Sequence, residues 1–333
     1  MPRSSRGPAV SVVVPTYQRR DLLPRVLRPL LADPALHELV VVVDGSTDGT
    51  AELLARARAA DPRVRPVLQP NRGLAAARQR GAEEATGDLL LLLDDDVLPG
   101  PGLPGAHAAA HARADDPCLV LVGHMPNDPR RVPRERRAVA EMYARAYAAA
   151  SAGWEAGDDV LLHFWAGHFS LRRDAALRIG LATPGDEVYR RQEDRDFGMR
   201  ALAAGYRGVF DRGLHAEHLF ERGMAAWRRE CFETGAHRSH LERVHHEVLG
   251  VSGGAVPRGV THRRRPLALA LGVVAQAVAT TPVAGTVVDA AVGAHALVTR
   301  VPGTGAPARF LALRTSGGVQ ALRPPAARSM RSR

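Results

Sequence analysis

Residues 88–97 read DLLLLLDDDV, and this stretch decides the predicted fold. Five consecutive leucines after a turn signal predict a strand that is buried on both faces, as is typical of parallel sheets. The strand ends in Asp94, Asp95 and Asp96, three carboxylates that repel one another unless a cation or hydrogen-bond donors lie among them. Because alternate side chains of an extended chain share a face, we expect Asp94 and Asp96 to point to one site and Asp95 to point away.

Two carboxylates at this spacing suggest a site for Mg²⁺ or Mn²⁺. Hard oxygen ligands suit both ions, and Mg²⁺ usually shares its coordination shell with substrate phosphates. The simpler interpretation of the same residues is a solvated acidic turn. On the metal-site hypothesis, Asp95 is the aspartate that should tolerate replacement best.

The composition is that of a globular protein. A chain of 333 residues, 45% of them apolar, can bury the core of one large α/β domain with an appendage, or of two ordinary domains. The formal net charge is +10, and all 45 basic residues are arginine. Codon bias in a GC-rich genome explains that arginine content as well as function does, so we expect no nucleic-acid partner. Arginine pairs with phosphates, which is compatible with a phosphate-bearing or anionic-membrane partner.

The two cysteines, Cys118 and Cys231, form neither a CxxC motif nor a zinc-binding spacing, so a reducing cytosol is the default compartment. The apolar run at residues 10–14 is too short for the core of a signal peptide. The sequence has no run of about 18 uninterrupted apolar residues that would mark a membrane span. We therefore expect a cytoplasmic protein, and a peripheral position on the cytoplasmic face of the membrane stays open.

Short apolar strands alternate with helices through the first part of the chain. The predicted strands cover residues 10–14, 39–43 and 64–68, and the predicted helices cover residues 21–31 with Asp21 as N-cap, 50–60 and 74–85. This alternation predicts βαβ units and a mainly parallel sheet sandwiched by helices. Ligands bind beyond the carboxyl ends of such strands, so we expect the loops at 15–17, 44–46 and 94–96 to meet. Neither a dinucleotide fingerprint nor a Walker loop is present.

Three segments carry a family resemblance: VVVPTYQR (12–19), VVVVDGSTDGT (40–50) and NRGLAAARQRGAEEATGDLLLLLDDD (71–96). In this order they resemble the nucleotide-sugar half of family 2 glycosyltransferases, which have the GT-A fold. The resemblance implies that the first two loops hold the nucleoside, that the NxGxxxAR segment lies against base and ribose, and that a DxD binds the metal of the diphosphate. It assigns donor binding to Pro15, Thr16, Tyr17, Arg19, Asp44, Gly45, Ser46, Gly73, Arg78 and Asp94, and metal binding to Asp94 and Asp96. Val43 stands where the family often has a second acidic residue, so Asp44 must serve alone.

A second resemblance lies in the acceptor half. WAGHFSLRRDAALRIG (165–180) predicts a turn, a short strand and a helix beginning at Asp174, and it is similar to the acceptor-side segment of the family, although His168 stands where asparagine is common. In RRQEDRDFGMRALAAGYRGVF (190–210), Glu193 and Asp194 open a helix that ends at Gly205. A carboxylate at a helix N-terminus is also an ordinary cap. The match to the family's ED motif implies that Asp194 is the catalytic base, with Glu193 beside it.

FDRGLHAEHL (210–219) is predicted as a polar loop with two histidines. Such histidines are usually solvated or hydrogen-bonded. The family commonly has a histidine here that reaches the metal or the diphosphate, and the spacing from Phe210 favours His218 over His215, a choice that stays open. Further elements are predicted as a helix ending near residue 111, a strand at 118–122 and a helix at 139–150. The basic cluster at 128–137 is predicted as a solvated loop or helix start.

The C-terminal third has a different texture. Residues 224–248 are predicted as an amphipathic helix, and its histidines, with Arg and Glu neighbours, as a solvated face rather than a metal cluster: His237, His240, His245 and His246. The apolar segments at 267–279 and 282–298 follow three arginines. They are compatible with two packed helices, and equally with a monotopic hairpin on an anionic leaflet.

The predicted organisation is a disordered start (1–8), a catalytic domain (9–222), a helical extension (223–300) with membrane association open, and a largely disordered tail (301–333). The catalytic domain divides into a nucleotide-sugar half (9–98) and an acceptor half (99–222).

The leading functional hypothesis is metal-dependent, inverting hexosyl transfer from a nucleotide-diphosphate sugar to a hydroxyl acceptor. The acceptor would be a glycan, a lipid-linked molecule or a secondary metabolite, as in polysaccharide or cell-envelope biosynthesis. A phosphatase-like hydrolase would need an aspartate at Ser46, and it is absent. The alternative from another class is a catalytically silent nucleotide-sugar or polyanion-binding protein, which a pI of 10.8 permits. An intact DxD together with an intact ED pair argues against it.

Overall fold

The structure, a computed structural model, describes residues 7–182 and 192–223, and further on residues 226, 227, 230, 241, 244, 245 and 248. The chain divides into two compact units, residues 1–221 and 222–333, and the sheet and the candidate site belong to the first. The predictions for the apolar segments at 267–298 and for the tail lie outside the described residues, as does most of the predicted helix at 224–248. Within that helix, His245 is described and is only 8% exposed, contrary to the expected solvated face.

Eight strands and seven α-helices make up the first unit in the part of the chain that the structure describes. The strands are β1 (Val10–Thr16), β2 (Leu36–Asp44), β3 (Val64–Gln69), β4 (Leu89–Leu93), β5 (Val97–Pro99), β6 (Leu119–His124), β7 (His168–Arg172) and β8 (Arg207–His218). The helices are α1 (Leu23–Leu31), α2 (Thr50–Ala60), α3 (Leu74–Glu84), α4 (Leu103–Ala114), α5 (Arg134–Glu155), α6 (Arg173–Ile179) and α7 (Glu193–Ala203), with the 3-10 turn η1 (Pro129–Arg131). None of the described helices is both long and apolar enough to cross a membrane.

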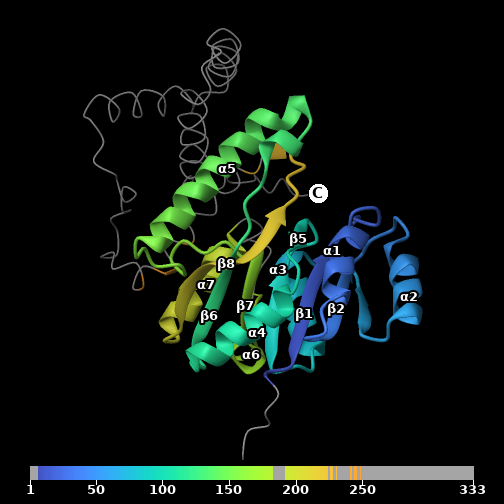
Figure 1. Cartoon of the computed structure of the whole chain (residues 1–333), viewed down its shortest axis with the longest axis horizontal. Coiled ribbons are helices and arrows are strands. Elements are labelled where there is room, and N and C mark those ends of the chain that lie inside the picture. Colours follow the sequence, from blue (N-terminus) through green and yellow to red (C-terminus); the bar gives the residue numbers. More distant parts are fainter. Residues whose placement is uncertain are drawn as a thin grey trace, which may run out of the picture. The chain divides into compact units, whose positions relative to one another are not determined.

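The strands form one sheet in the order β3-β2-β1-β4-β7-β6-β8-β5 (Figure 1). In the first half, β1 runs parallel to β2 and β4, and β2 runs parallel to β3. In the second half, β7 is antiparallel to both β4 and β6, β8 is parallel to β6, and β5 is antiparallel to β8. The predicted parallel sheet is therefore confirmed for the nucleotide-sugar half, whereas the acceptor half is mixed.

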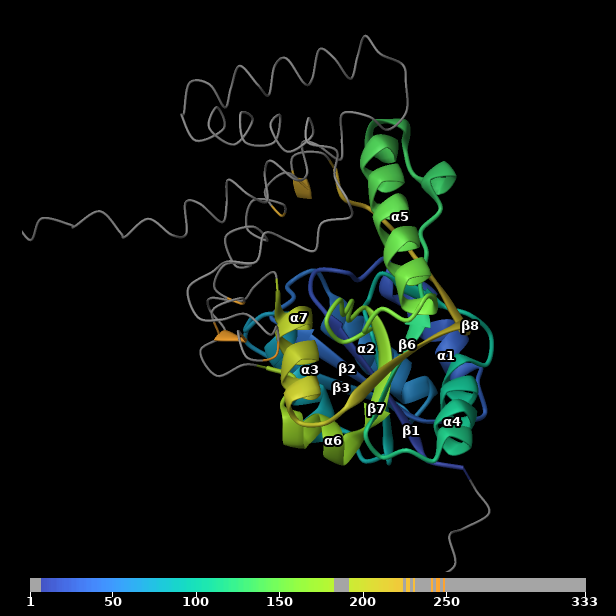
Figure 2. The same cartoon turned by 90° about the vertical axis from the view of Figure 1, so that its left-hand side faces the viewer.

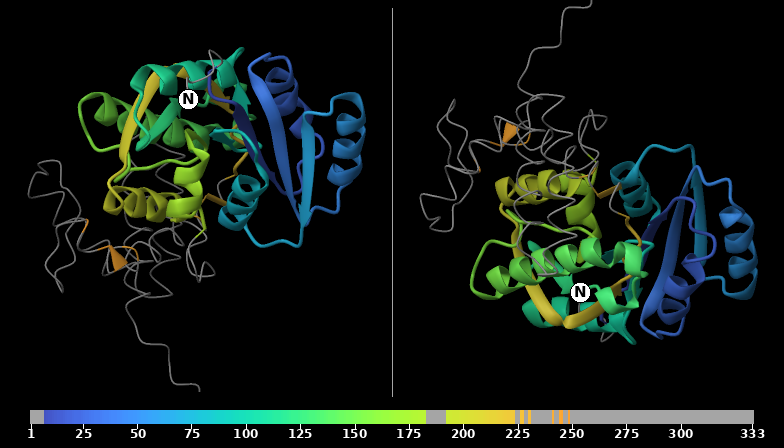
Figure 3. Two further views of the ribbon diagram at one scale, coloured as in Figure 1. Left: turned by 90° about the horizontal axis from the view of Figure 1, so that it is seen from below. Right: turned by 90° about the horizontal axis from the view of Figure 1, so that it is seen from above.

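The five leucines of β4 lie at the centre of this sheet. Each is at most 1% exposed, with β1 on one side and β7 on the other. Figure 2 shows α3, α6 and α7 on one face and α1 and α4 on the other, while α2 packs at the edge strand β3 (Figure 3). Burying a leucine side chain contributes roughly 2 kcal/mol, so β4 is a main source of the stability that fixes its carboxyl end.

Three predicted boundaries are wrong. Asp21 is not an N-cap, because α1 begins at Leu23 after Leu22, which makes no side-chain cap; Pro24 favours the first turn instead. The predicted loop around Phe210 belongs to β8, whose buried positions alternate only towards its end because charged residues occupy the exposed face. Helix α5 covers 22 residues and not only 139–150.

Gly81 sets how closely α3 approaches the sheet. A Cβ at Gly81 would lie 2.2 Å from Cγ1 of Val13 and 3.2 Å from Cγ2 of Val42. We expect Gly81→Ala to lower the free energy of unfolding by about 1–3 kcal/mol, because overpacking outweighs a gain in helix propensity of up to about 1 kcal/mol. Urea unfolding at pH 7 measures this, with Arg80→Ala on the exposed side of α3 as a control that should change stability by less than about 0.5 kcal/mol. Equal stability of Gly81→Ala and wild type would contradict the close packing.

Candidate active site

The loops after β1 and β2 are hydrogen-bonded to each other. The backbone N–H of Gln18 donates to Ser46 Oγ at 2.9 Å, and the Gln18 side chain exchanges two bonds with Thr47, at 3.0 and 3.2 Å. The backbone N–H of Arg20 donates to Asp48 Oδ2 at 2.9 Å. The two predicted nucleoside loops therefore meet. Gln18 was missed as a site residue, because its left-handed backbone (φ 56°) is more usual for glycine or asparagine and leaves no signal in the sequence.

Asp44 fixes the loop that precedes α3. Its buried carboxylate accepts hydrogen bonds from the backbone N–H groups of Arg72 and Gly73, both at 2.8 Å, and from Gln69 Nε2 at 2.8 Å. Asp44 thus already has three protein donors and shapes the NxGxxxAR loop. Its predicted contact with a nucleoside stays a prediction.

The other nucleoside candidates line the same edge of the sheet. Pro15 and Thr16 are buried, whereas the ring of Tyr17 is 50% exposed and free to stack on a flat aromatic ligand. Gly45 adopts φ 78°, and a Cβ there would lie 2.7 Å from the backbone N of Asn71. A side chain at Gly45 would therefore separate the second loop from the third.

The three aspartates lie in a turn. The N–H of Val97 donates to the carbonyl of Asp94 at 3.0 Å, so the chain is not extended there and the alternation expected for these side chains does not apply. The prediction that Asp95 points away is wrong: its side chain is 15% exposed, and its Oδ1 lies 3.8 Å from Arg19 Nε. Burial, followed by the charge of Asp96, raises the pKa of Asp95 to about 7.

His218 lies beside the last of these aspartates. Its Nε2 is 3.5 Å from Asp96 Oδ2, and its ring centroid is 4.9 Å from that of Tyr143. Its Nδ1 is buried and has no hydrogen-bond partner among the described residues. His215 is exposed and faces His124, with ring centroids 5.5 Å apart. The structure thus places His218, and not His215, next to the DxD.

The donor set of Asp94, Asp96 and His218 fits a divalent cation that is completed by a ligand. Among the described residues no three His, Cys, Asp or Glu side chains are already arranged to hold one. Mg²⁺ and Mn²⁺ sites often use one or two carboxylates plus substrate phosphates and water. Burial, followed by the charge of Asp96, raises the pKa of Asp95, and a cation would stabilise these carboxylates. The buried, unpartnered Nδ1 belongs to the His218 ring whose Nε2 faces Asp96.

The guanidinium of Arg78 lies between the DxD and the ED pair at the start of α7 and interacts with both. Arg78, 5% exposed, donates from Nη2 to Asp94 Oδ1 at 2.5 Å and to the carbonyl of Ala166 at 3.1 Å. Its charge also acts on Glu193 and Asp194. Burial raises the pKa of Asp194, while burial and the Asp194 charge raise the pKa of Glu193 to about 8. Carboxylates about 100 residues apart in sequence thus form one electrostatic site.

The rest of the first turns of α7 is structural. Asp196 is 1% exposed and pairs with Arg200 Nε at 2.8 Å, and Arg200 Nη1 donates to the carbonyl of Ile179 at 2.7 Å. Arg195 donates to the carbonyl of Leu162 at 3.3 Å. These bonds hold α7 against α6 and against the segment before β7, and so fix where the ED pair lies.

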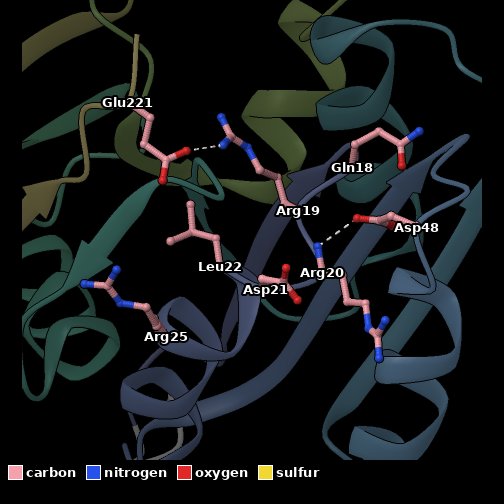
Figure 4. Close-up of a pocket in the computed structure, with 8 residues that line it drawn as sticks. All are labelled: Gln18, Arg19, Arg20, Asp21, Leu22, Arg25, Asp48 and Glu221. Carbon is pink, nitrogen blue, oxygen red and sulfur yellow. Dashed lines mark hydrogen bonds and ion pairs between the residues drawn. The ribbon is translucent and has the colours of Figure 1, made fainter. Parts of the chain in front are cut away.

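An open pocket of about 320 Å³ borders the first loop (Figure 4). It is lined by Gln18, Arg19, Arg20, Asp21, Leu22, Arg25, Asp48 and Glu221. Arg19 Nη1 pairs with Glu221 Oε2 at 2.6 Å, while Arg19 Nε faces Asp95. Arg19 therefore connects the aspartate turn to the segment after β8. Glu221 could not be predicted as a neighbour of Arg19, because the contact spans 202 positions.

Behind the site, three buried histidines form a hydrogen-bonded cluster. His107 Nε2 lies 2.9 Å from His168 Nε2, and Ser170 Oγ lies 2.7 Å from His107 Nδ1 and 2.9 Å from His111 Nε2. His168 is 0% exposed, so it is a core residue of β7 rather than an acceptor-facing one. Gly123 provides the space for it, because a Cβ there would lie 2.1 Å from His168 Cε1.

This cluster predicts acid sensitivity. Burial lowers the pKa of His111 to about 4 and of His168 to about 3, and that of His107 well below its usual range. Their stabilising contribution is present above the unfolded pKa of about 6.5 and is lost as pH falls towards 4, because the unfolded chain then binds more protons. Asp95 and Glu193, with raised pKa values, act in the opposite direction.

A variant pair isolates the histidine contribution. We expect wild type to lose about 1–2 kcal/mol more than His111→Gln in unfolding free energy between pH 7 and pH 5, measured by urea titration. His37→Gln, which replaces an exposed histidine, should keep the wild-type pH dependence. If all three proteins lost stability equally, His111 would not be a buried neutral group.

Comparisons with known proteins identify the family and the fold. A family model, Glycosyl transferase family 2, matches residues 11–180, just over half of the chain. Validoxylamine A glucosyltransferase from Streptomyces hygroscopicus subsp. limoneus is 40% identical over 125 residues, which are 36% of this chain and 27% of that protein. Undecaprenyl-phosphate 4-deoxy-4-formamido-L-arabinose transferase from Pseudomonas savastanoi pv. phaseolicola is 40% identical over 99 residues, 28% of this chain and 29% of that protein. The chain thus matches less than a third of the length of these curated relatives.

Among solved structures, the mannosyltransferase PcManGT from Pyrobaculum calidifontis, in complex with GDP-Man and Mn²⁺, superposes with a TM-score of 0.59 at 22% identity. The superposition covers 96% of this chain and 88% of that one. At this identity the likeness shows the fold, a curled mixed sheet between helices. With the family model covering the three strand-end loops and β7, the chain belongs to glycosyl transferase family 2 and has its GT-A fold.

Proposed function

We propose that this chain transfers a sugar from a nucleotide-diphosphate sugar to a hydroxyl group of an acceptor. The observation that carries the proposal is the common site of Asp94, Glu193 and Asp194 around the buried guanidinium of Arg78. A donor-side carboxylate and a candidate base are thereby held together at the carboxyl edge of a parallel sheet, where ligands bind in this architecture. Membership of the family supports sugar transfer as the chemistry.

The donor is proposed to lie over the joined loops after β1, β2 and β3. The exposed ring of Tyr17 would stack on the base, while Thr16, Asp44, Ser46 and Gly73 would shape the nucleoside site. A structural neighbour solved with GDP-Man and Mn²⁺ supports a nucleotide sugar as the donor class.

A divalent cation, Mg²⁺ or Mn²⁺, is proposed as the cofactor, held by Asp94, Asp96 and His218. When bound, it would supply positive charge where the departing diphosphate gains negative charge. Independently of the cation, Arg19 brings a guanidinium to the same turn, 3.8 Å from Asp95.

Asp194 is proposed as the general base. The acceptor oxygen forms a bond to the anomeric carbon, the bond from that carbon to the diphosphate oxygen breaks, and the nucleoside diphosphate leaves with the electron pair. Asp194 takes the acceptor proton, and attack from the face opposite the leaving group inverts the anomeric centre. Of the pair, Asp194 suits this role better. Its Oδ1 accepts the Arg195 N–H at 2.8 Å, and the charges of Arg78 and Arg195 oppose the rise in its pKa that burial causes, while burial and the charge of Asp194 raise the pKa of Glu193 to about 8.

The acceptor is proposed to be a hydroxyl-bearing glycan, lipid-linked molecule or secondary metabolite, and the sugar a hexose. The names of the two relatives include both an undecaprenyl-phosphate and a validoxylamine A substrate. The Tyr143 ring lies next to His218, and the Trp165 ring, its centroid 5.3 Å from that of Tyr143, is proposed to extend an apolar surface for the acceptor. A role in polysaccharide or cell-envelope synthesis, with a peripheral membrane contact on the cytoplasmic side, is part of the proposal.

A thermal-shift screen of nucleotide sugars with Mg²⁺, Mn²⁺ or chelator tests the donor. We expect stabilisation by one class of nucleotide sugar only when metal is present, and release of the nucleoside diphosphate once an acceptor pool is added. No stabilisation by any nucleotide sugar would overturn the proposal. Metal-dependent binding without hydrolysis or transfer across an acceptor panel would favour the catalytically silent binding protein.

A further inference from the structure

We infer that Arg78 is a positioning residue that ties the donor-side Asp94 to the Glu193–Asp194 pair, and that it does not contact the nucleoside. This inference rests on the proposed function, and it assigns Arg78 a different task from the base and ribose contact that the resemblance implied.

The position of Arg78 on α3 directs its side chain inwards. The neighbouring positions Ala75, Ala77 and Gly81 are small and buried, so the helix lies close to β1 and β2. Arg78 itself is 5% exposed. A buried, fixed cation must be matched by acceptors, and a guanidinium stays protonated at any pH that the fold survives.

The bonds of Arg78 join two parts of the site. Its Nη2 donates both to Asp94 Oδ1 and to the carbonyl of Ala166, while the N–H of Asp94 donates to the carbonyl of Gly167 at 3.0 Å. The backbone of Asp94 is therefore held by Gly167, and its side chain is held by Arg78, which is itself bonded to Ala166. A Cβ at Gly167 would lie 2.8 Å from Met125 Sδ and 3.3 Å from Asp94 Oδ2, so this segment packs closely against Asp94.

The segment 161–167, which includes Ala166 and Gly167, also contacts α7, the helix that begins with the Glu193–Asp194 pair. Arg195 bonds to the carbonyl of Leu162, and a Cβ at Gly198 of α7 would lie 2.1 Å from the carbonyl oxygen of Leu161. Helix α7 therefore packs directly on the segment that Arg78 holds. A displacement of Arg78 would be passed to both Asp94 and Asp194 through this one segment.

Only a few charged groups, of both signs, act on Asp194 among the described residues. Among the described residues, the charged groups that act on it are Arg78 from α3, Arg195 from α7, Asp94 after β4 and its neighbour Glu193. Removing Arg78 would leave Arg195 as the one cation that opposes the combined effect of burial and the Asp94 charge on Asp194. Asp194 would then hold its proton to higher pH, and less of the base form would exist at pH 7.

Arg78→Met and Arg78→Lys test this inference, with Arg80→Met on the exposed side of the same helix as control. In Arg78→Met we expect kcat to fall about 10- to 100-fold, while the donor Kd from calorimetry stays within about threefold of wild type. The acid limb of the pH–rate profile should move up by about one pH unit. Arg78→Lys should restore the acid limb but only part of kcat, because it keeps the charge and loses the planar fork.

A readout that needs no turnover separates this inference from the proposed function. The carboxyl resonance of Asp194, titrated by NMR in the ligand-free protein, should have its midpoint about one pH unit higher in Arg78→Met than in wild type, and near the wild-type value in Arg78→Lys. If the wild type bound no nucleotide sugar, the proposed function would fail while the NMR shift still tested the link. An unchanged Asp194 midpoint in folded Arg78→Met, or a donor Kd raised more than about tenfold with kcat unchanged in that variant, would overturn the inference.

Discussion

Asp194→Asn is expected to lower kcat by about 10²- to 10⁴-fold while leaving donor binding within about threefold of wild type. The amide keeps the shape and most hydrogen bonds of the side chain but cannot accept the acceptor's proton, and a positioned general base contributes a factor of this size. Steady-state transfer assays and calorimetry with the donor found in the screen measure the two quantities. Because the change is isosteric, the Arg195 N–H can still donate to the side-chain oxygen, and the fold should be retained.

Glu193→Gln is the matched control for this prediction. The structure gives Glu193 a pKa of about 8, so glutamine resembles the form that this residue already has at pH 7. We expect a loss in kcat of less than about tenfold. If Glu193→Gln were the inactive variant and Asp194→Asn retained wild-type turnover, the base would be Glu193 and the assignment within the pair would be reversed.

The features that could be predicted from the sequence are those set by local patterns. The five leucines of β4 predict a strand buried on both faces because no polar residue interrupts them, and α2 begins at Thr50 and ends at Ala60 as predicted. The meeting of the first two loops also follows from pattern, since parallel strands bring their carboxyl ends to one edge.

What could not be predicted depends on contacts between distant residues. Side chains at Asp94, Asp95 and Asp96 would alternate only in an extended chain, whereas the hydrogen bond from the Val97 N–H to the Asp94 carbonyl closes a turn. That turn directs Asp95 towards Arg19, an interaction that no spacing rule contains.

Arg78 and His168 show the same limitation. Each belongs to a segment that resembles a substrate-facing motif, yet each is buried, because its partner comes from another element: Asp94 for Arg78 and His107 for His168. Family resemblance gave no indication that these side chains point inwards. That direction is decided by packing, since small residues on α3 and at Gly123 open the inward space.

Asp96→Ala is expected to abolish most of the metal-dependent part of nucleotide binding. Asp96 lies in the crowded turn and beside His218 Nε2, so its carboxylate is the oxygen ligand that links the two sides of the proposed cation site. Even outer-shell partners of a metal ligand contribute 10- to 100-fold to metal affinity, so loss of a direct ligand should weaken binding of the nucleoside diphosphate in Mn²⁺ by at least about 10²-fold. Calorimetry of UDP and GDP with Mn²⁺, and with chelator, measures this.

In chelator, wild type and Asp96→Ala should bind the nucleotide equally weakly. Asp21→Ala removes one exposed carboxylate from the neighbouring pocket and controls for net charge; it should keep the wild-type metal dependence. Should Asp96→Ala and Asp21→Ala bind the nucleotide equally tightly in Mn²⁺, the cation would not lie at the end of β4, and its ligands would have to be sought elsewhere in the chain.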